Sequence, residues 1–199
     1  MTRMPQEPRS RMNEFLPDYD FHAAYGTCIN APASAVYRRL LVSDFYSARV
    51  VRLLMALRTG KRSSRHRPPR DLRGRFEGSG FLLLAEAPGE ELVIGVAGKF
   101  WRPDGGRCLD ITAADFVGFS RPGSAKAVMN FRLKPGSPHG TVLSTETRIK
   151  CCDRAARWRF RLYWALVGPF SGVIRKAILK QVKAETQADV EGGLGERTA

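Results

Sequence analysis

The sequence predicts an α+β protein in which a curved antiparallel sheet wraps around one long C-terminal helix. Three observations lead to this prediction. Residues 153–190 carry apolar side chains at the spacing of an amphipathic helix. Several earlier segments alternate apolar and polar residues with the period of two that strands show. Turns rich in Pro and Gly separate these segments, and strands joined by such short turns pair in antiparallel order.

Size and charge limit the organisation of the chain. With 199 residues, a single domain with its own core is favoured. We expect a flexible segment at 1–14, the domain at 15–190 and a flexible tail at 191–199. Lys and Arg number 33 against 19 Asp and Glu, a formal net charge of +14. This balance indicates an anionic partner, such as nucleic acid or an anionic membrane, or a basic surface without one, and both interpretations stay open.

The compartment is predicted from what the chain lacks. Its N-terminus is basic but has no apolar stretch of a secretory signal, and no run reaches the roughly 18 to 20 apolar residues of a membrane span. Cys28, Cys108, Cys151 and Cys152 show no metal-binding spacing, so reduced thiols are expected. We therefore expect a soluble, cytoplasmic protein.

The N-terminal third is predicted to form one strand and two short helices. Residues 21–30 alternate as a strand does. Pro32 stands near the start of a short helix whose apolar face carries Val36 and Leu40. A second helix is predicted at 47–58, where apolar residues again follow helical spacing.

The loop at 59–75 is densely basic and contains Gly60, Pro68 and Pro69. Such a segment cannot bury itself, so it is expected in solvent. It is either an anion-binding or membrane-touching lip or an ordinary solvated loop. It has no interleaved aromatic residues, which weakens the case for single-stranded nucleic acid.

Strand periodicity returns from Gly80 onward. Residues 81–86 and 91–101 predict a hairpin around Pro88 and Gly89. The remaining predicted elements are a short strand at 107–111, a helical turn at 112–119, and strands at 125–133 and 141–151. The face of strand 125–133 opposite its apolar residues is expected to be wet; it carries Lys126, Val128, Asn130 and Arg132.

The long helix is predicted to be apolar over more than half of its circumference. Its core stripe consists of Ala156, Phe160, Tyr163, Trp164, Val167, Ser171, Ile174, Ile178 and Val182. Leu162, Leu166, Phe170, Val173 and Ala177 widen this apolar side, whereas the basic residues, Arg175 among them, are assigned to another arc. Pro169 has no N–H to donate to the carbonyl of Ala165, so a bend is expected there.

The order of these elements resembles the helix-grip fold of the START-like superfamily. That superfamily covers polyketide cyclase and lipid-transport proteins of the birch-pollen-allergen-like (SRPBCC) group. The resemblance spans about 18–188. It is carried by Ile29-Asn30-Ala31-Pro32-Ala33-Ser34-Ala35-Val36-Tyr37, Gly98-Lys99-Phe100-Trp101-Arg102-Pro103, Leu143-Ser144-Thr145-Glu146-Thr147-Arg148-Ile149, and Tyr163-Trp164 with Gly168-Pro169-Phe170-Ser171-Gly172-Val173-Ile174-Arg175. Some of these stretches are similar to uncharacterised bacterial members. The resemblance implies a cavity between the sheet and the long helix.

The residues that would line such a cavity follow from the alternation of the strands. From the sheet these are Tyr25, Ile94, Val96, Phe100, Met129, Phe131, Thr145 and Thr147, and from the helix Phe160, Tyr163, Trp164 and Val167. Each of them could also simply pack a core. The hydroxyls among them are candidates for a ligand's polar atoms, because a buried hydroxyl needs a partner.

Catalytic residues stay unknown at this stage. A general acid or base must reach the reacting atom, and the inward set contains no His, Asp or Glu. Glu146 and Arg148 fall on the opposite face, where an outward ion pair is expected; a flipped register would turn them inward. There is no phosphate-binding loop, dinucleotide-binding turn or zinc spacing, so no cofactor or metal is expected.

The first hypothesis for function is binding, transport or sensing of a small hydrophobic ligand, such as a lipid, polyketide or aromatic metabolite. One alternative is an enzyme of cyclase or dehydratase type acting on a polyketide-like substrate, which the resemblance permits. Another is an interaction protein that docks through its basic loop and the second apolar side of its helix. No specific nucleic acid is expected as a partner, and peripheral contact with an anionic membrane and a monomeric or homodimeric state stay open.

Overall fold

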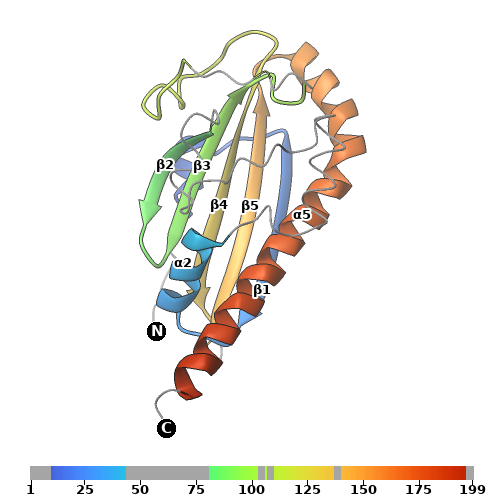
Figure 1. Cartoon of the computed structure of the whole chain (residues 1–199). Coiled ribbons are helices and arrows are strands. Elements are labelled where there is room, and N and C mark those ends of the chain that lie inside the picture. Colours follow the sequence, from blue (N-terminus) through green and yellow to red (C-terminus); the bar gives the residue numbers. More distant parts are fainter. Residues whose placement is uncertain (1–9, 44–80, 103–105, 107–109, 137–139, 196–199) are drawn as a thin grey trace, which may run out of the picture.

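The protein is built on an open antiparallel sheet with a long helix packed against it (Figure 1). The computed structural model describes residues 10–43, 81–102, 106, 110–136 and 140–195. Five strands in the order β1-β5-β4-β3-β2 form the sheet. They are β1 (Phe21–Ile29), β2 (Phe81–Ala87), β3 (Glu91–Gly98), β4 (Ala125–Pro135) and β5 (Thr141–Cys151). The predicted α+β class is therefore confirmed.

Three helices accompany the sheet within the described residues: α1 (Met12–Phe15), α2 (Ala33–Val42) and α5 (Arg154–Gly195). Helix α2 is the predicted short helix after the first strand. The second predicted helix, at 47–58, and the basic loop at 59–75 lie outside the described residues. Helix α5 continues five residues beyond the predicted domain end, through Gly195.

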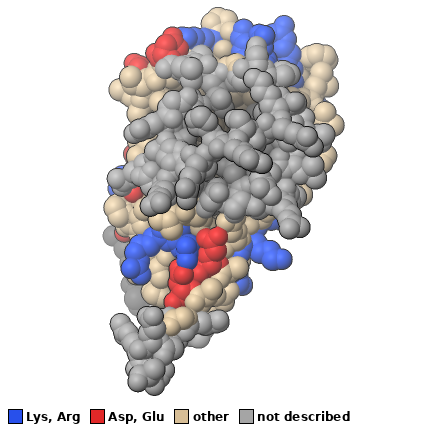
Figure 2. Space-filling model, viewed as in Figure 1, with Lys and Arg blue, Asp and Glu red and all other residues tan. Residues whose placement is uncertain are grey.

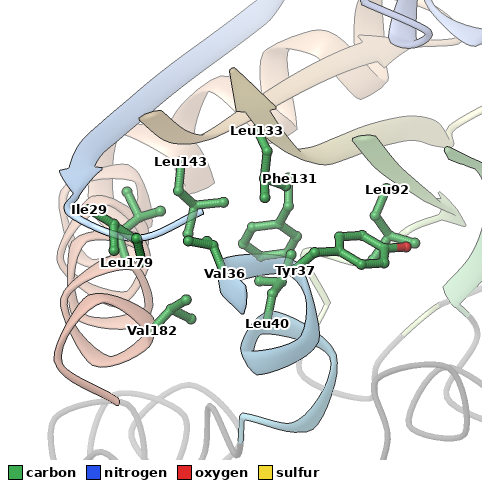
Figure 3. Close-up of a cluster of buried hydrophobic side chains, with 11 residues drawn as sticks. Ile29, Val36, Tyr37, Leu40, Leu92, Phe131, Leu133, Leu143, Leu179 and Val182 are labelled. Carbon is green, nitrogen blue, oxygen red and sulfur yellow. The ribbon is translucent and has the colours of Figure 1, made fainter. Parts of the chain in front are cut away.

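Helices α2 and α5 cover one face of the sheet, called the inner face below. Figure 3 shows side chains from four strands projecting toward both helices. This cluster comprises Ile29, Ala31, Val36, Tyr37, Leu40, Leu92, Phe131, Leu133, Leu143, Leu179 and Val182. The predicted helical face of α2, with Val36 and Leu40 fully buried, supplies its centre.

Helix α5 has 42 residues, so it is about 60 Å long at ~1.5 Å per residue. Its start is capped by Asp153, whose Oδ1 accepts a hydrogen bond from the N–H of Ala156 at 2.7 Å. Pro169 lies inside the helix, and the ribbon changes direction along its orange part (Figure 1). The helix lies against β1 and β5, with Phe160 buried and Trp164 half-buried.

Strand β3 is shorter than predicted. The sequence assigned residues 91–101 to it, but it ends at Gly98, whose φ of 121° turns the chain. The N–H of Lys99 then donates to the carbonyl of Gly106 at 2.6 Å. Phe100 consequently sits in a turn. Of the strand predicted at 107–111, only 110–111 are described, and they are not in a strand.

The outer face of the sheet is not the wet surface that the alternation predicted. Val128 is fully buried and Asn130 is 2% exposed, because α1 and the segment 110–124 cover them. Met12 from α1 and Phe116 from the segment pack beside Val128. Residues 12–14, assigned to the flexible N-terminal segment by the sequence, therefore belong to a helix that packs on this face.

A polar network holds the N-terminal segment to the outer face. Glu91 Oε1 accepts hydrogen bonds from Ser10 Oγ and Asn130 Nδ2, both at 2.6 Å. The N–H of Arg11 donates to the other carboxylate oxygen at 2.9 Å. Asn130 Oδ1 in turn accepts from the N–H of Glu146 at 2.8 Å. Glu91 is therefore buried but hydrogen-bonded through both oxygens.

Near the C-terminal end of α5, an ion pair joins α2 to α5. Arg39 Nε donates to Asp189 Oδ2 at 2.9 Å and lies 3.9 Å from Glu185. Figure 2 shows acidic and basic atoms side by side on this lower part of the molecule. No helix in the described parts of the chain is both long enough and apolar enough to cross a bilayer.

Candidate functional site

The predicted lining residues lie at or beside the inner face, but they divide into three groups. The first is an aromatic cluster around Phe160 near the start of α5. The centroid of the Phe160 ring lies 4.9 Å from that of Phe21, 5.6 Å from that of Tyr163, 5.7 Å from those of Trp101 and Trp164, and 5.8 Å from that of Phe100. Sequence reasoning included four of these residues and missed Phe21 and Trp101. With Phe160 1% exposed, this group forms a packed aromatic core.

The second group is apolar core on the central strands, together with one residue of α5. Ile94 and Val96 on β3 and Phe131 on β4 are buried, and Phe131 packs into the cluster of Figure 3. Met129 is half-buried and stands opposite Ile94 in the register of β3 and β4. Val167, on α5, is also half-buried.

The third group is polar and lies where α5 crosses β1 and β5. Tyr25 on β1 pairs with Thr145 on β5, and Thr147 follows on the same face. Both threonines are buried, at 1% and 6% exposure. Thr145 Oγ1 accepts a hydrogen bond from Arg175, whereas Thr147 Oγ1 is buried without a partner in the described structure. These hydroxyls were predicted to face the interior, and they do.

Arg175 completes this polar group from the helix side. Its Nη1 donates to Thr145 Oγ1 at 3.1 Å, and its Nε is buried with no hydrogen-bond acceptor. No acidic residue pairs with it in the part of the chain that the structure describes. Burial lowers the pKa of Arg175 to about 10, while the neighbouring Tyr25 acts in the opposite direction. Its guanidinium therefore remains charged at neutral pH.

Gly172 allows the helix to approach this group. A Cβ at Gly172 would lie 2.5 Å from the Tyr25 hydroxyl, closer than atoms pack. A larger residue at this position would therefore force the Tyr25 side chain to move.

The assignment of Arg175 to an arc other than the core stripe was wrong. Arg175, Leu179, Val182 and Thr186 follow the i, i+4, i+7, i+11 spacing of one helical face, and the last three are buried. The spacing therefore contained the signal. At 100° per residue, Arg175 falls beside Ser171 and Val182, both of which were placed on the core stripe.

A groove of about 400 Å³ opens beside the polar group, between α5 and β1. It is lined by Gly26, Thr27, Lys176, Leu179, Lys180 and Lys183. The Nζ of Lys176 also lies 5.5 Å from the centroid of the Tyr25 ring, which connects the groove to the polar group. Three lysines and no acid make this opening electropositive.

The leading catalytic candidate of the sequence points away from this site. Glu146 is on the outer face, where its Oε1 lies 2.7 Å from Arg148 Nε and 3.1 Å from His22 Nε2. The register is thus the expected one and not the flipped one. Within the described residues, no group of three or more His, Cys, Asp or Glu side chains is placed to hold a metal ion.

No family model and no curated protein matches the sequence. Solved structures that the chain is similar to include protein CV1439 from Chromobacterium violaceum, at 17% identity and a TM-score of 0.33, covering 83% of this chain and 96% of that one. TTHA0849 from Thermus thermophilus has 10% identity and a TM-score of 0.33, and the match covers 85% of this chain and 99% of that one. The di-domain ARO/CYC BexL from the BE-7585A biosynthetic pathway has 14% identity and a TM-score of 0.32, and the match covers 82% of this chain and 46% of that one.

Proposed function

We propose that this protein binds a small, mainly hydrophobic molecule between α5 and the sheet, as a carrier or sensor of a lipid, polyketide or aromatic metabolite. One observation carries the proposal. Arg175 Nε and Thr147 Oγ1 are buried without partners in the described structure, at the interface between α5 and the sheet. Leaving buried polar atoms unpaired is costly, and a ligand's polar atoms would satisfy them.

The proposal is tested on purified protein. Native mass spectrometry and solvent extraction are expected to recover a co-purifying apolar molecule, and a fluorescent fatty acid is expected to gain intensity on binding. Thr147→Val should weaken that binding, because it removes a hydroxyl that meets the ligand. Val117→Ala, an exposed change on the outer side, is the control. Failure to recover any molecule, together with no uptake of acidic, ester or alcohol probes, would overturn the proposal.

We also propose that the outward side of α5 contacts an anionic membrane surface. Trp158, Leu162, Leu166, Phe170 and Val173 are 43% to 71% exposed on one side of the helix. Exposed arginines accompany them at 154, 157, 159 and 161. Aromatic and aliphatic groups beside Arg favour the interface of a bilayer with anionic lipids. Such contact would let a carrier exchange its ligand with a membrane.

Vesicle co-sedimentation tests this contact. Phosphatidylcholine vesicles containing phosphatidylserine are expected to bind the protein, and the binding should weaken as salt rises. The double change Leu162→Gln with Leu166→Gln should abolish it, whereas Val117→Gln, equally exposed elsewhere, should not. A concentration-dependent dimer that the double change dissociates, with no vesicle binding, would assign this face to a second copy of the chain instead.

A further inference from the structure

We infer that the ligand is an amphiphilic anion, with one carboxylate or phosphate group held by Arg175 and a hydrophobic body along the inner face. This inference rests on the proposed function and specifies the ligand's chemistry. It comes from the arrangement of charge at the site.

Arg175 differs from other arginines near the sheet. Arg148 pairs with Glu146, and Arg157 pairs with Asp20. Arg175 has only the neutral Thr145 hydroxyl in the described structure, although its Nε is buried. A buried charge without a counterion is unfavourable. An anion that accepts a hydrogen bond from the unpaired Arg175 Nε would therefore stabilise this site.

The geometry suits a carboxylate or phosphate. A guanidinium presents several N–H donors in one plane, and such anions accept two of them at once. Thr145 occupies Nη1 and leaves Nε without an acceptor. The Thr147 hydroxyl, on the same face of β5, also lacks a partner and can donate to the same anion.

A row of buried and half-buried side chains continues from this point across the inner face of the sheet. Thr147 stands opposite Met129, and Met129 opposite Ile94, in one cross-strand row of the inner face. A hydrocarbon body whose acid group meets Arg175 would lie along this row. The basic groove at Lys176, Lys180 and Lys183 lies at the opposite side of the polar group, and its charge would attract an anionic ligand.

Matched probes test the inference without any variant. The wild-type protein is titrated with cis-parinaric acid and its methyl ester, and bound probe is displaced by palmitate, hexadecyl phosphate and hexadecanol. We expect the acid to bind about tenfold or more tightly than the ester, the scale of a hydrogen bond to a charged group. Palmitate and hexadecyl phosphate together establish whether carboxylate or phosphate is preferred, and equal displacement by hexadecanol would contradict the inference.

Variants then locate the anion. Arg175→Met should remove the preference for acid over ester while leaving affinity for the ester within about twofold, and Arg175→Lys should retain part of it. Arg38→Met removes the same charge from an exposed position on α2 and should leave the acid preference unchanged. If Arg175→Met fails to fold, the comparison of Arg175→Lys with wild type still measures how much of the preference for acid over ester depends on Arg175.

The outcomes distinguish the proposed binding of a hydrophobic ligand from the proposed anion site at Arg175. If neither probe binds the wild type, the proposed function fails. If both bind equally, or if the acid preference survives Arg175→Met, ligand binding stands and the anion site is rejected.

Discussion

The buried threonine hydroxyls of this protein differ in whether they have a hydrogen-bond partner. Most buried oxygens are satisfied: Thr141 Oγ1 donates to the carbonyl of Ala31 at 2.7 Å, and Thr186 Oγ1 to that of Val182 at 2.7 Å. Thr147 is the exception on β5. A buried hydroxyl without a partner lowers stability, so Thr147 is better explained by binding than by folding.

Thr147→Val and Thr141→Val separate these two roles. Without ligand, Thr147→Val should leave the free energy of unfolding unchanged or raise it by up to about 1 kcal/mol, because no hydrogen bond is lost. Thr141→Val should lower it by about 1 kcal/mol, because it leaves the Ala31 carbonyl unpaired. Urea unfolding of ligand-free protein measures both. Equal losses would show that Thr147 has a partner after all.

Two cysteines should differ in reactivity. Burial, with a further contribution from the Asp20 carboxylate, raises the pKa of Cys151 to about 12, whereas Cys28 is exposed. The thiolate is the reactive form. At about pH 8, iodoacetamide should therefore modify Cys28 well before Cys151 by peptide mass spectrometry. After unfolding in guanidinium the two rates should converge, and fast labelling of Cys151 in folded protein would contradict its burial.

The sequence predicted the site unevenly at this scale. The alternation placed Tyr25, Thr145 and Thr147 correctly because strand periodicity decides which face a side chain occupies. It assigned Arg175 to the wrong arc of the helix, although the helical spacing puts this residue on the face of Leu179 and Val182.

Among the elements, α5 has two different apolar sides. Its inner side carries Phe160, which packs against other aromatic residues, and its outer side carries Phe170, 43% exposed. Helical periodicity identified the side with Phe160 as the core stripe, and its burial confirms that assignment. The packing determines which side stabilises the fold.

Phe160→Ala and Phe170→Ala measure that difference. Removing the buried ring should cost about 3–5 kcal/mol of unfolding free energy, since it leaves a cavity. Removing the exposed ring should change it by no more than about 0.5 kcal/mol. Chemical denaturation of both variants gives the values. Comparable losses would mean that the outer side is also packed in solution.

The start of α5 gives a pH dependence. Hydrogen bonds from the N–H groups of Ala156 and Gly123 hold the pKa of Asp153 below its ordinary value of 3.8. A lowered carboxyl pKa stabilises the folded state above the unfolded value, and the contribution disappears as pH falls through the folded value. Asp153→Ala should thus lower the melting temperature at neutral pH, and the difference from wild type should shrink below about pH 4. Asp18→Ala, at an exposed position, should show no such difference.

At the scale of the whole molecule, the sequence predicted the strands, the long helix and their antiparallel order. It did not predict that the outer face would be covered. Period-two alternation on β4 indicated one wet face, but Phe116 and Met12, distant in sequence, bury that face. Such long-range coverage leaves no local pattern, which is why the outer layer was missed while the inner one was expected.

That outer layer has a consequence for shortened forms of the protein. Deleting residues 1–9 keeps the hydrogen bonds of Ser10 and Arg11 with Glu91 and is the reference with which a longer deletion is compared. Deleting residues 1–16 leaves the Glu91 carboxylate with the Asn130 amide as its remaining donor and opens the hydrophobic patch around Val128 to water. The longer deletion should therefore melt much earlier and bind the dye ANS. The usable boundary of this fold thus lies ahead of its first strand.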